Sequence, residues 1–435
     1  MLPETFTKSL WSALSPSGLE QPELGDDVQC DVLVIGAGLL GLSTALHLAE
    51  SGVKVTLVEA DEVGFGASGR NTGFVVPSLR TALGPENVSS KLGAHHGERL
   101  NNLVGNSGST VFDLIRRLRI ECNAEQSGWL QPAHSAKMAG LLSLRCNEWR
   151  RRGKHLEYLS AEQTRMRTGI GGYHGALFIP SGGQINPLAY ARGLARACVE
   201  RGVEIYEHTR VTSFARSGAR WIARTRKASV TSERVLLTTN ALIGRLVPEV
   251  AASIIPARVF QISTQTFDEG TQQQILPTRS PIADTRRHTF AVRWSPDGRL
   301  MTGGLVMPGP GRLERTKRVF AERLASFVPL KTTVETPYVW TGVVAATLDS
   351  LPRFMFIAPG MDAAIGCNGR GVALTTSLGK EIATLYSTGM PNREFVLPHD
   401  KPKPVPMRRL AELGPYVWLP WSEFRDRMEA SSQRT

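Results

Sequence analysis

Three glycines near the start of the chain have a spacing that suits phosphate binding. Gly36, Gly38 and Gly41 form the pattern G-x-G-x-x-G, and Glu59 follows the last of them by 18 residues. In a dinucleotide site the first glycine permits a tight turn, the second lets the backbone approach a pyrophosphate, and the third lets a helix pack closely on a strand. Glu59 would accept hydrogen bonds from a ribose diol, and its charge disfavours a 2′-phosphate. The pattern therefore favours NAD or FAD over NADP.

Two further segments are rich in small residues. Residues 63–73 give a long ligand room to lie against the backbone, where Arg70 would neutralise phosphate and Ser68 and Asn71 would donate hydrogen bonds. Residues 366–371 precede a predicted helix, and their N–H groups would face an electron-rich ring edge such as a flavin N1–C2=O. Three such zones suit the elongated FAD better than NAD.

The elements around these residues are predicted to form a parallel sheet. Residues 30–35 are a short, continuous apolar run, which is typical of a strand buried on both faces. Residues 42–52 have helical spacing, and residues 53–59 form a second apolar run. The three segments make a complete βαβ unit, as a dinucleotide site requires.

The rest of the chain changes character along its length. Residues 96–160 are predicted to be mainly helical, and after Pro256 the segments 259–267, 289–294 and 299–304 alternate as antiparallel strands do. The expected fold is α/β plus α+β: a Rossmann-like FAD-binding domain with an inserted antiparallel-sheet substrate domain. The expected division is an N-terminal extension 1–28, an FAD-binding domain of 29–95, 158–255 and 335–395, a substrate domain of 96–157 and 256–334, and a tail 396–435.

Composition excludes several classes of function. The net charge is +12, but its one dense basic patch, residues 145–154, is accompanied by no nucleic-acid-binding motif, so no nucleic-acid partner is expected. The five cysteines lie far apart without zinc spacing, so neither a metal nor a disulfide framework is expected. Without a secretory signal or a run of roughly 18 apolar residues, the sequence favours the cytoplasm, with weak peripheral binding to an anionic membrane left open.

These motifs together resemble the FAD-dependent D-amino-acid/glycine/sarcosine oxidase superfamily. GAGLLG (36–41) with Glu59, GASGRNTG (66–73), LLTTNA (236–241), WTGVVAATLDSLP (340–352) and GCNGRGVALTTSLGKEIA (366–383) match, from about Asp31 to Leu385. The second segment is similar to that of a gamma-glutamylputrescine oxidoreductase-like subgroup. The residues that the motifs and the resemblance assign to FAD are Gly36, Gly38, Leu39, Leu40, Gly41, Glu59, Ala60, Gly66, Ala67, Ser68, Arg70, Asn71, Thr72, Gly73, Val211, Asn240, Ala241, Gly366, Gly369, Arg370, Gly371 and Val372.

The resemblance also assigns roles and shows one departure. It implies that Val211 meets the adenine and that Arg370, with a catalytic role, stabilises the reduced ring. Related amino-acid oxidases often carry a carboxylate-clamping arginine at the position of Val344. Because valine cannot hold a carboxylate, Arg293 is the first alternative clamp and Arg258 the second. Phe74 is expected to line the substrate site.

Covalent attachment of the flavin is not indicated. No cysteine lies between Tyr338 and Pro352, which does not support a cysteinyl-flavin bond, and nothing favours His95 or His96 as an attachment point.

The expected activity is oxidation of a C–N bond in an amine or amino acid. The neutral amine would pass a hydride from its α-carbon to flavin N5, the imine would hydrolyse to a carbonyl compound, and O₂ would reoxidise the flavin. Two alternatives stay open. One is a membrane-associated dehydrogenase that uses a quinone or carrier and touches the bilayer through the aromatic tail 416–421; the other is a non-catalytic flavin-binding assembly factor. An NAD-dependent dehydrogenase fits less well.

Overall fold

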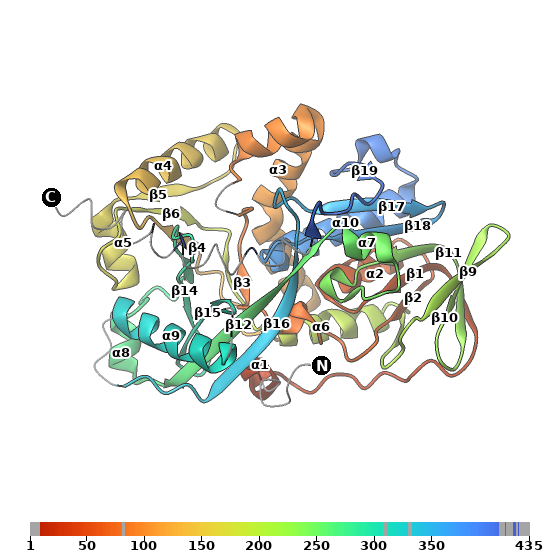
Figure 1. Cartoon of the computed structure of the whole chain (residues 1–435), viewed down its shortest axis with the longest axis horizontal. Coiled ribbons are helices and arrows are strands. Elements are labelled where there is room, and N and C mark those ends of the chain that lie inside the picture. The colour runs from red at the N-terminus through yellow and green to blue at the C-terminus, as the bar shows by residue number, and fades with distance from the viewer. Residues whose placement is uncertain are drawn as a thin grey trace.

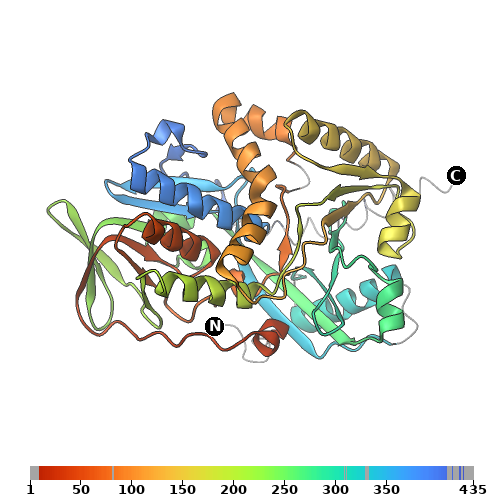
Figure 2. The same ribbon diagram turned by 180° about the vertical axis from the view of Figure 1, so that it is seen from behind.

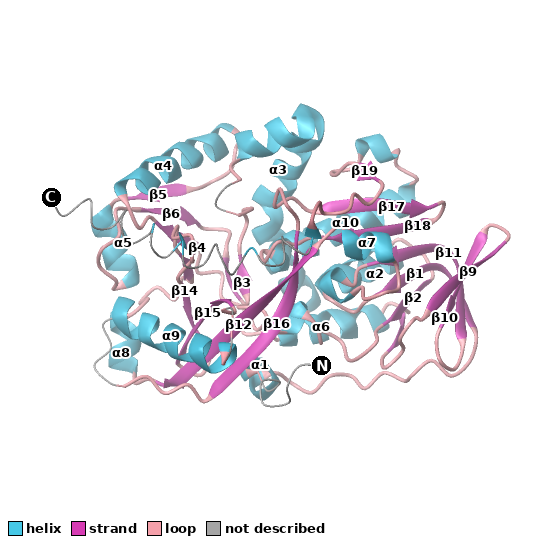
Figure 3. Cartoon of the chain, in the orientation of Figure 1, coloured by secondary structure: helices cyan, strands magenta, loops and turns pink. Residues whose placement is uncertain are grey.

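The chain forms two parts that lie side by side, one on a nine-stranded sheet and one on an eight-stranded sheet (Figure 1). The structure is a computed structural model that describes residues 9–80, 83–307, 309, 311–328 and 333–408, with the single residues 414, 421, 422 and 425. Both parts contain strands and helices (Figure 3), and helix α3 (Pro85–Leu118) runs between them (Figure 2). The expected fold class, α/β plus α+β, is confirmed.

The nine-stranded sheet is parallel at its centre, where β11, β1, β2 and β8 lie next to one another. β1 is buried along most of its length because its apolar, β-branched residues have helices on both sides. The sheet has the order β19-β17-β18-β11-β1-β2-β8, with the β9–β10 hairpin attached to β11. Its strands are β1 (Val28–Ile35), β2 (Val55–Val58), β8 (Glu204–Tyr206), β9 (Ser213–Ser217), β10 (Arg220–Arg224), β11 (Ser229–Leu237), β17 (Arg353–Ala358), β18 (Met361–Ile365) and β19 (His399–Asp400).

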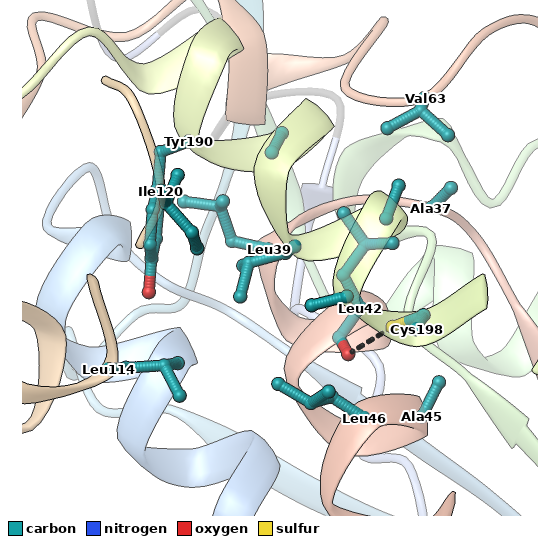
Figure 4. Close-up of a cluster of buried hydrophobic side chains, with 14 of the residues drawn as sticks. Ala37, Leu39, Leu42, Ala45, Leu46, Val63, Leu114, Ile120, Tyr190 and Cys198 are labelled. Atoms are coloured by element: carbon teal, nitrogen blue, oxygen red, sulfur yellow. Dashed lines mark hydrogen bonds between the residues drawn. The ribbon is translucent and has the colours of Figure 1, made fainter. Parts of the chain in front are cut away.

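Four helices share one core on one face of this sheet. They are α2 (Leu39–Glu50), the C-terminal half of α3, α6 (Pro187–Val199) and α10 (Gly371–Thr388). Figure 4 shows leucines of α2 packed against residues of α6, where Cys198 Sγ donates to the carbonyl oxygen of Leu42 at 3.4 Å. The other face is covered by η3 (Asn240–Leu242), α7 (Pro248–Ala252) and the segments beside them.

The helices α2 and α10 approach each other unusually closely. A Cβ on Gly379 would lie 2.7 Å from Cβ of Ser43, and the Ser43 hydroxyl donates to the carbonyl oxygen of Thr376 at 2.7 Å. Because β1, β11 and β18 are parallel, α2 and α10 both begin at the same edge of the sheet.

The eight-stranded sheet is mainly antiparallel, with the order β16-β12-β15-β14-β13-β4-β6-β5. Its strands are β4 (Trp129–Pro132), β5 (Glu157–Leu159), β6 (Ala176–Ile179), β12 (Ile255–Thr266), β13 (Ile282–Ala283), β14 (Ala291–Trp294), β15 (Arg299–Leu305) and β16 (Tyr338–Ala346). Helices α4 (Ala136–Arg151), α5 (Ala161–Thr168), α8 (Glu269–Gln274) and α9 (Arg312–Phe327) accompany it, and β3 (Phe74–Val75) and β7 (Gly183–Gln184) form a separate small ribbon.

Sheet membership differs from the expected domain ranges in several places. β6 and β16 lie in the eight-stranded sheet, although ranges 158–255 and 335–395 were expected to belong to the FAD-binding domain. Conversely, Val111 and Ile115 of α3 pack into the core beneath the nine-stranded sheet, although range 96–157 was expected in the substrate domain. The reason is that the chain crosses between the two parts within single elements and short loops.

The described part of the N-terminal extension, residues 9–28, acts as a strap between the two parts of the molecule. Helix α1 (Leu10–Leu14) buries Trp11 completely, and the Trp11 indole N–H donates to the carbonyl oxygen of Asn71 at 2.8 Å. Its ring also packs edge-on against Trp340 of β16, with ring centroids 6.5 Å apart. The extension therefore connects the small-residue loop after β2 to the eight-stranded sheet.

Two expectations from the sequence concern a membrane: the lack of a spanning helix, and contact with the bilayer through the aromatic tail. Within the part of the chain that the structure describes, no helix is long and apolar enough to cross a bilayer. The aromatic tail 416–421 lies outside the described residues apart from Trp421, whose ring centroid lies 5.6 Å from the Arg287 guanidinium carbon.

We expect Trp11→Ala to lower the free energy of unfolding by about 3–5 kcal/mol, because it removes a fully buried indole and leaves a cavity. Urea denaturation followed by far-UV circular dichroism measures the change. Trp421→Ala is the matched control, since Trp421 is 50% exposed, and it should shift the urea midpoint much less. Equal shifts for the two variants would contradict the strap.

Candidate active site: an FAD cavity between the two sheets

The turn between β1 and α2 requires its glycines. Gly36 has a φ of +110°, and a Cβ on Gly41 would lie 2.1 Å from the carbonyl oxygen of Gly36. The Thr238 hydroxyl, at the end of β11, lies 2.9 Å from the carbonyl oxygens of both Ile35 and Gly36. The turn is therefore fastened to the neighbouring strand in a shape that only glycines permit.

The N-terminus of α2 is suited to an anion. Its N-cap is Gly38, no side chain of that residue caps the helix, and the first turn carries no acidic residue. The amide N–H of Leu39 donates to the hydroxyl Oγ of Ser68 at 3.0 Å, and a Cβ on Gly38 would lie 2.8 Å from that same oxygen. Free amides and the helix dipole stabilise a phosphate at such an end.

Glu59 lies beside this turn, at the end of β2. Its carboxylate accepts hydrogen bonds from the amides of Ala37 at 2.8 Å and Asp61 at 3.0 Å. Burial raises the pKa of Glu59 above its usual range. The side chain is thereby held where a ribose would lie next to the pyrophosphate, with Ala60 next in sequence and the buried Val211 in the hydrophobic cluster that includes Val58 of β2.

A cavity of about 610 Å³ extends from the α2 N-terminus to the α10 N-terminus and the inner face of the eight-stranded sheet. The residues predicted from sequence that line it come from all the small-residue zones: Gly38, Leu39, Leu40, Ala67, Ser68, Asn71, Thr72, Phe74, Asn240, Val344, Gly369, Arg370, Gly371 and Val372. Segments more than 300 residues apart in the sequence thus share one cavity.

The sheet covers this cavity with small side chains. Ala257 and Val259 of β12, Gly303 and Gly304 of β15, and Val344 of β16 line the cavity. In the register, Ala257 pairs with Val344, so these residues form one patch of the sheet. A surface without long side chains leaves room for a flat ring, which is the signal in these strands that sequence reasoning did not use.

The second glycine-rich loop is held in place by Asn240 and Asn368. Asn240 Oδ1 accepts from the amide of Gly366 at 3.3 Å, and Asn368 Oδ1 accepts from the amide of Thr347 at 2.8 Å. Gly366 has a φ of +85°, and Gly369 has a φ of +79°. The loop therefore presents the first amides of α10 to the cavity, while Ala241 lies beside Asn240 in η3.

Arg370 lies at the start of α10 and lines the cavity. It donates to Ser78 Oγ at 2.7 Å, and its guanidinium carbon lies 4.9 Å from the Trp129 ring centroid. Burial lowers the pKa of Arg370 to about 9, and the positive charges of Arg80 and Arg145 add to this effect. Arg370 is thus a crowded cation beside a ligand cavity.

Arg70 occupies a different place from the predicted one. Its Nε donates to the carbonyl oxygen of Phe65 at 2.8 Å, one Nη donates to that of Thr341 at 3.3 Å, and it is absent from the cavity lining. The arginine links the loop to β16 instead of pointing at a phosphate. The loop glycines Gly66 and Gly73 are also structural: Gly66 precedes η2 (Ala67–Gly69), and a Cβ on Gly73 would lie 2.1 Å from the carbonyl oxygen of Ile185.

The geometry contradicts the prediction that Arg293 clamps substrate. Arg293 is only 1% exposed, lies outside the cavity lining, and donates to the carbonyl oxygens of Thr72 at 2.9 Å and Ile185 at 2.7 Å. Burial lowers its pKa to about 9. Thr289 and Ala291, which precede it in the same segment, do line the cavity. Arg293 lies beyond the cavity, where its side chain contacts the loop that follows β2.

The second alternative, Arg258, is also wrong. Ala257 and Val259 line the cavity, so the side chain between them faces the other side of β12. Burial and the charge of Arg312 lower the pKa of Arg258.

Sequence reasoning missed the polar residues at the substrate side. Arg80, His134, Arg286, Arg287 and His288 line the cavity, whereas no aspartate or glutamate of the described part of the chain does. Asp284 accepts a hydrogen bond from Arg286 but is itself absent from the lining. A signal was present in the Arg286-Arg287-His288 run, but nothing in the sequence indicates that it faces the cavity.

Comparison with known proteins agrees with this geometry. The family model DAO, described as FAD dependent oxidoreductase, matches residues 31–385. The chain belongs to this family. The expected superfamily is confirmed, and FAD is the cofactor of this oxidoreductase.

Individual relatives span nearly the whole chain. Gamma-glutamylputrescine oxidoreductase of Escherichia coli (strain K12) is 32% identical over 381 residues, covering 87% of this chain and 88% of the relative. A probable oxidoreductase OrdL of Haemophilus influenzae (strain ATCC 51907 / DSM 11121 / KW20 / Rd) is 29% identical over 367 residues, covering 83% and 84%.

Solved structures share the fold. Glycine oxidase from Geobacillus kaustophilus superposes with a TM-score of 0.69 at 19% identity, covering 84% of this chain and 96% of that one. L-proline dehydrogenase from P. horikoshii superposes with a TM-score of 0.70 at 18% identity, covering 85% and 94%. This DAO-family chain therefore shares the fold of those two proteins.

We expect Gly38→Val in this DAO-family protein to abolish FAD loading, because even a Cβ would meet Ser68 Oγ at 2.8 Å and a branched side chain would fill the pyrophosphate space. The measurement is the ratio of flavin absorbance to protein after reconstitution. Gly25→Val is the control, since a Cβ there has no atom within 4 Å. Normal FAD content in Gly38→Val would contradict the assigned site.

Arg293→Ala is expected to lower the free energy of unfolding by about 3 kcal/mol, since the backbone carbonyls of Thr72, Ile185 and Trp294 lose a charged donor and a cavity opens. Urea denaturation measures this loss. Folded Arg293→Ala protein should keep the wild-type affinity for substrate, because the residue lies outside the cavity. A raised substrate Kd without loss of stability would restore the clamp role.

Proposed function

We propose that the protein uses FAD to oxidise a C–N bond of an amine or amino acid, with O₂ as electron acceptor. One observation carries the proposal: among the residues that the structure describes, the cavity is lined by four arginines and two histidines, and by no carboxylate. Two of the similar proteins, gamma-glutamylputrescine oxidoreductase and glycine oxidase, are named for substrates of this class, which supports the proposal.

A cationic lining controls the protonation state of an amine. An ammonium ion inside a cavity with several arginines in its lining is disfavoured by like charge, so the pKa of a bound amine falls below the roughly 10.4 of a free alkylamine. The substrate is therefore held as the neutral amine, and its lone pair stabilises positive charge developing on the carbon that loses hydride. Bound FAD supplies the two-electron oxidant, and water converts the resulting imine to a carbonyl compound and an amine.

The apolar part of the cavity orients the reacting carbon. Val344, Ala257 and Val259 lie on the sheet face, and Phe74 and Leu374 also line the cavity. These side chains exclude water and restrict the substrate to few orientations, which lowers the barrier without a nucleophile from the protein. Because Val344 offers no charge, a carboxylate on the reacting carbon itself would be poorly held there, so glycine and small D-amino acids are proposed to be weak substrates.

Arg370 and the N-terminus of α10 are proposed to stabilise negative charge at the reduced ring. The first amides of α10 and the guanidinium both lie at one end of the cavity. Positive charge fixed before the reaction requires no rearrangement as electrons arrive.

Under anaerobic conditions, an alkylamine is expected to bleach the flavin absorbance, and Arg370→Ala is expected to slow this reduction about ten- to a hundredfold while FAD stays bound. Stopped-flow absorbance measures the rate. Because the lining lowers the pKa of the bound amine, the rate should rise with pH to a plateau below the pKa of the free amine. Arg226→Ala, a surface change at a side chain 79% exposed, should leave the rate unchanged.

The acceptor and the alternatives are separated by the same preparation. Oxygen consumption in proportion to amine added supports O₂ as the acceptor, whereas turnover only with a quinone or carrier favours the dehydrogenase. If no amine or amino acid in a broad panel bleaches the flavin, oxidation of those compounds is excluded. The alternative of a non-catalytic flavin-binding assembly factor is then favoured.

A further inference from the structure

One extended segment places an arginine at the cavity by simple alternation. Phe74, Val76 and Arg80 line the cavity, and Ser78 accepts a hydrogen bond from the cavity-lining Arg370 at 2.7 Å. The intervening Val75, Pro77 and Leu79 are buried and absent from the lining. Even-numbered side chains of this segment therefore face the ligand space, as the period of extended backbone requires.

Arg80 is chemically uncommitted. Its side chain makes no hydrogen bond or ion pair with any residue that the structure describes, and the residue is exposed while it lines the cavity, so it lies on the open side. Partial desolvation of the guanidinium nonetheless lowers the pKa of Arg80. A guanidinium that is partly desolvated and lacks an acceptor is a ready partner for a carboxylate.

The residues near Arg80 add further positive charge to this side of the cavity. Arg80 and Arg145 both act on the charge of Arg370, whose pKa they help to lower. The Arg145 side chain is buried and its Nε has no partner among the described residues, and the charge of Glu148 acts on it. Crowded like charges of this kind are stabilised when an anion binds among them.

The cofactor's phosphates already have a site of their own. The amides at the start of α2, beside Gly38, suit the pyrophosphate, and they belong to a different helix from Arg370. The anion that Arg80 awaits is therefore carried by the substrate.

We propose that Arg80 is a specificity residue that binds a carboxylate of the substrate located away from the reacting C–N bond. This inference rests on the proposed amine oxidation. It assigns the substrate class as amines that end in a remote carboxylate: the amine lies in the apolar part beside Val344, and the carboxylate lies at the open side, paired with Arg80 and close to the charge of Arg370. The neutral amine and the remote anion then each meet the lining that suits them.

The test compares matched substrates with and without the carboxylate. 4-Aminobutanoate, 6-aminohexanoate and 8-aminooctanoate are each compared with the alkylamine of the same chain length, using anaerobic flavin bleaching by wild type, Arg80→Ala, Arg80→Lys and Arg226→Ala. We expect Arg80→Ala to raise the apparent Kd of the best aminocarboxylate about ten- to a hundredfold, as for loss of one charged hydrogen bond. Its effect on the matched alkylamine should be less than about twofold, with Arg80→Lys in between and Arg226→Ala like wild type.

A second readout does not depend on turnover. Calorimetry measures binding of hexanoate and hexanamide to the FAD-loaded protein, and hexanoate should bind more tightly in wild type but not in Arg80→Ala. Equal effects of Arg80→Ala on aminocarboxylates and alkylamines, equal binding of hexanoate and hexanamide by wild type, or loss of FAD from Arg80→Ala would each overturn the inference. If no amine bleaches the flavin, the proposed function fails, while the calorimetric comparison still decides whether Arg80 binds a carboxylate.

Discussion

The site depends on two helix N-termini that open onto the same edge of one parallel sheet. Helix α2 follows β1 and α10 follows β18, and both strands are parallel to β11, which lies between them. Gly379 lets the two helices approach until a Cβ there would lie 2.7 Å from the Ser43 side chain. Two positive dipole ends are thus fixed near one another before any ligand arrives, one for a pyrophosphate and one for an electron-rich ring.

Placing a second sheet opposite this edge turns an edge into a cavity. The patch of β12, β15 and β16 that faces the helices carries glycine, alanine and valine. Three side-chain hydrogen bonds help to hold the two parts together. Trp11 donates to the Asn71 carbonyl oxygen, Arg70 to that of Thr341, and Arg293 to that of Thr72. The loop after β2 is the common element in all three, so the cofactor loop also serves as the joint between the parts.

Arginine performs different tasks here according to what opposes it. Arg70 and Arg293 satisfy backbone carbonyl oxygens, which a buried joint between two sheets would otherwise leave unpaired. Arg370 and Arg80 line the cavity, and no acid among its described lining residues opposes them. An arginine is therefore structural where its guanidinium donates to backbone carbonyl oxygens, and it is available for a ligand where its guanidinium lines the cavity.

The sequence alone determined the fold class, the phosphate turn and the cofactor. The turn depends on local backbone shape, because Gly36, Gly38 and Gly41 act within six residues of one another, whereas FAD followed from the composition of three small-residue zones, 36–41, 63–73 and 366–371. The face of a strand was also readable, since Arg293 shares alternation with the cavity-lining Ala291. What opposes that face was not. Only the tertiary structure decided that Arg293 donates to backbone carbonyl oxygens whereas Arg80 lines the cavity. Periodicity fixes the direction of a side chain, but it does not fix which distant segment of the chain packs against that side chain.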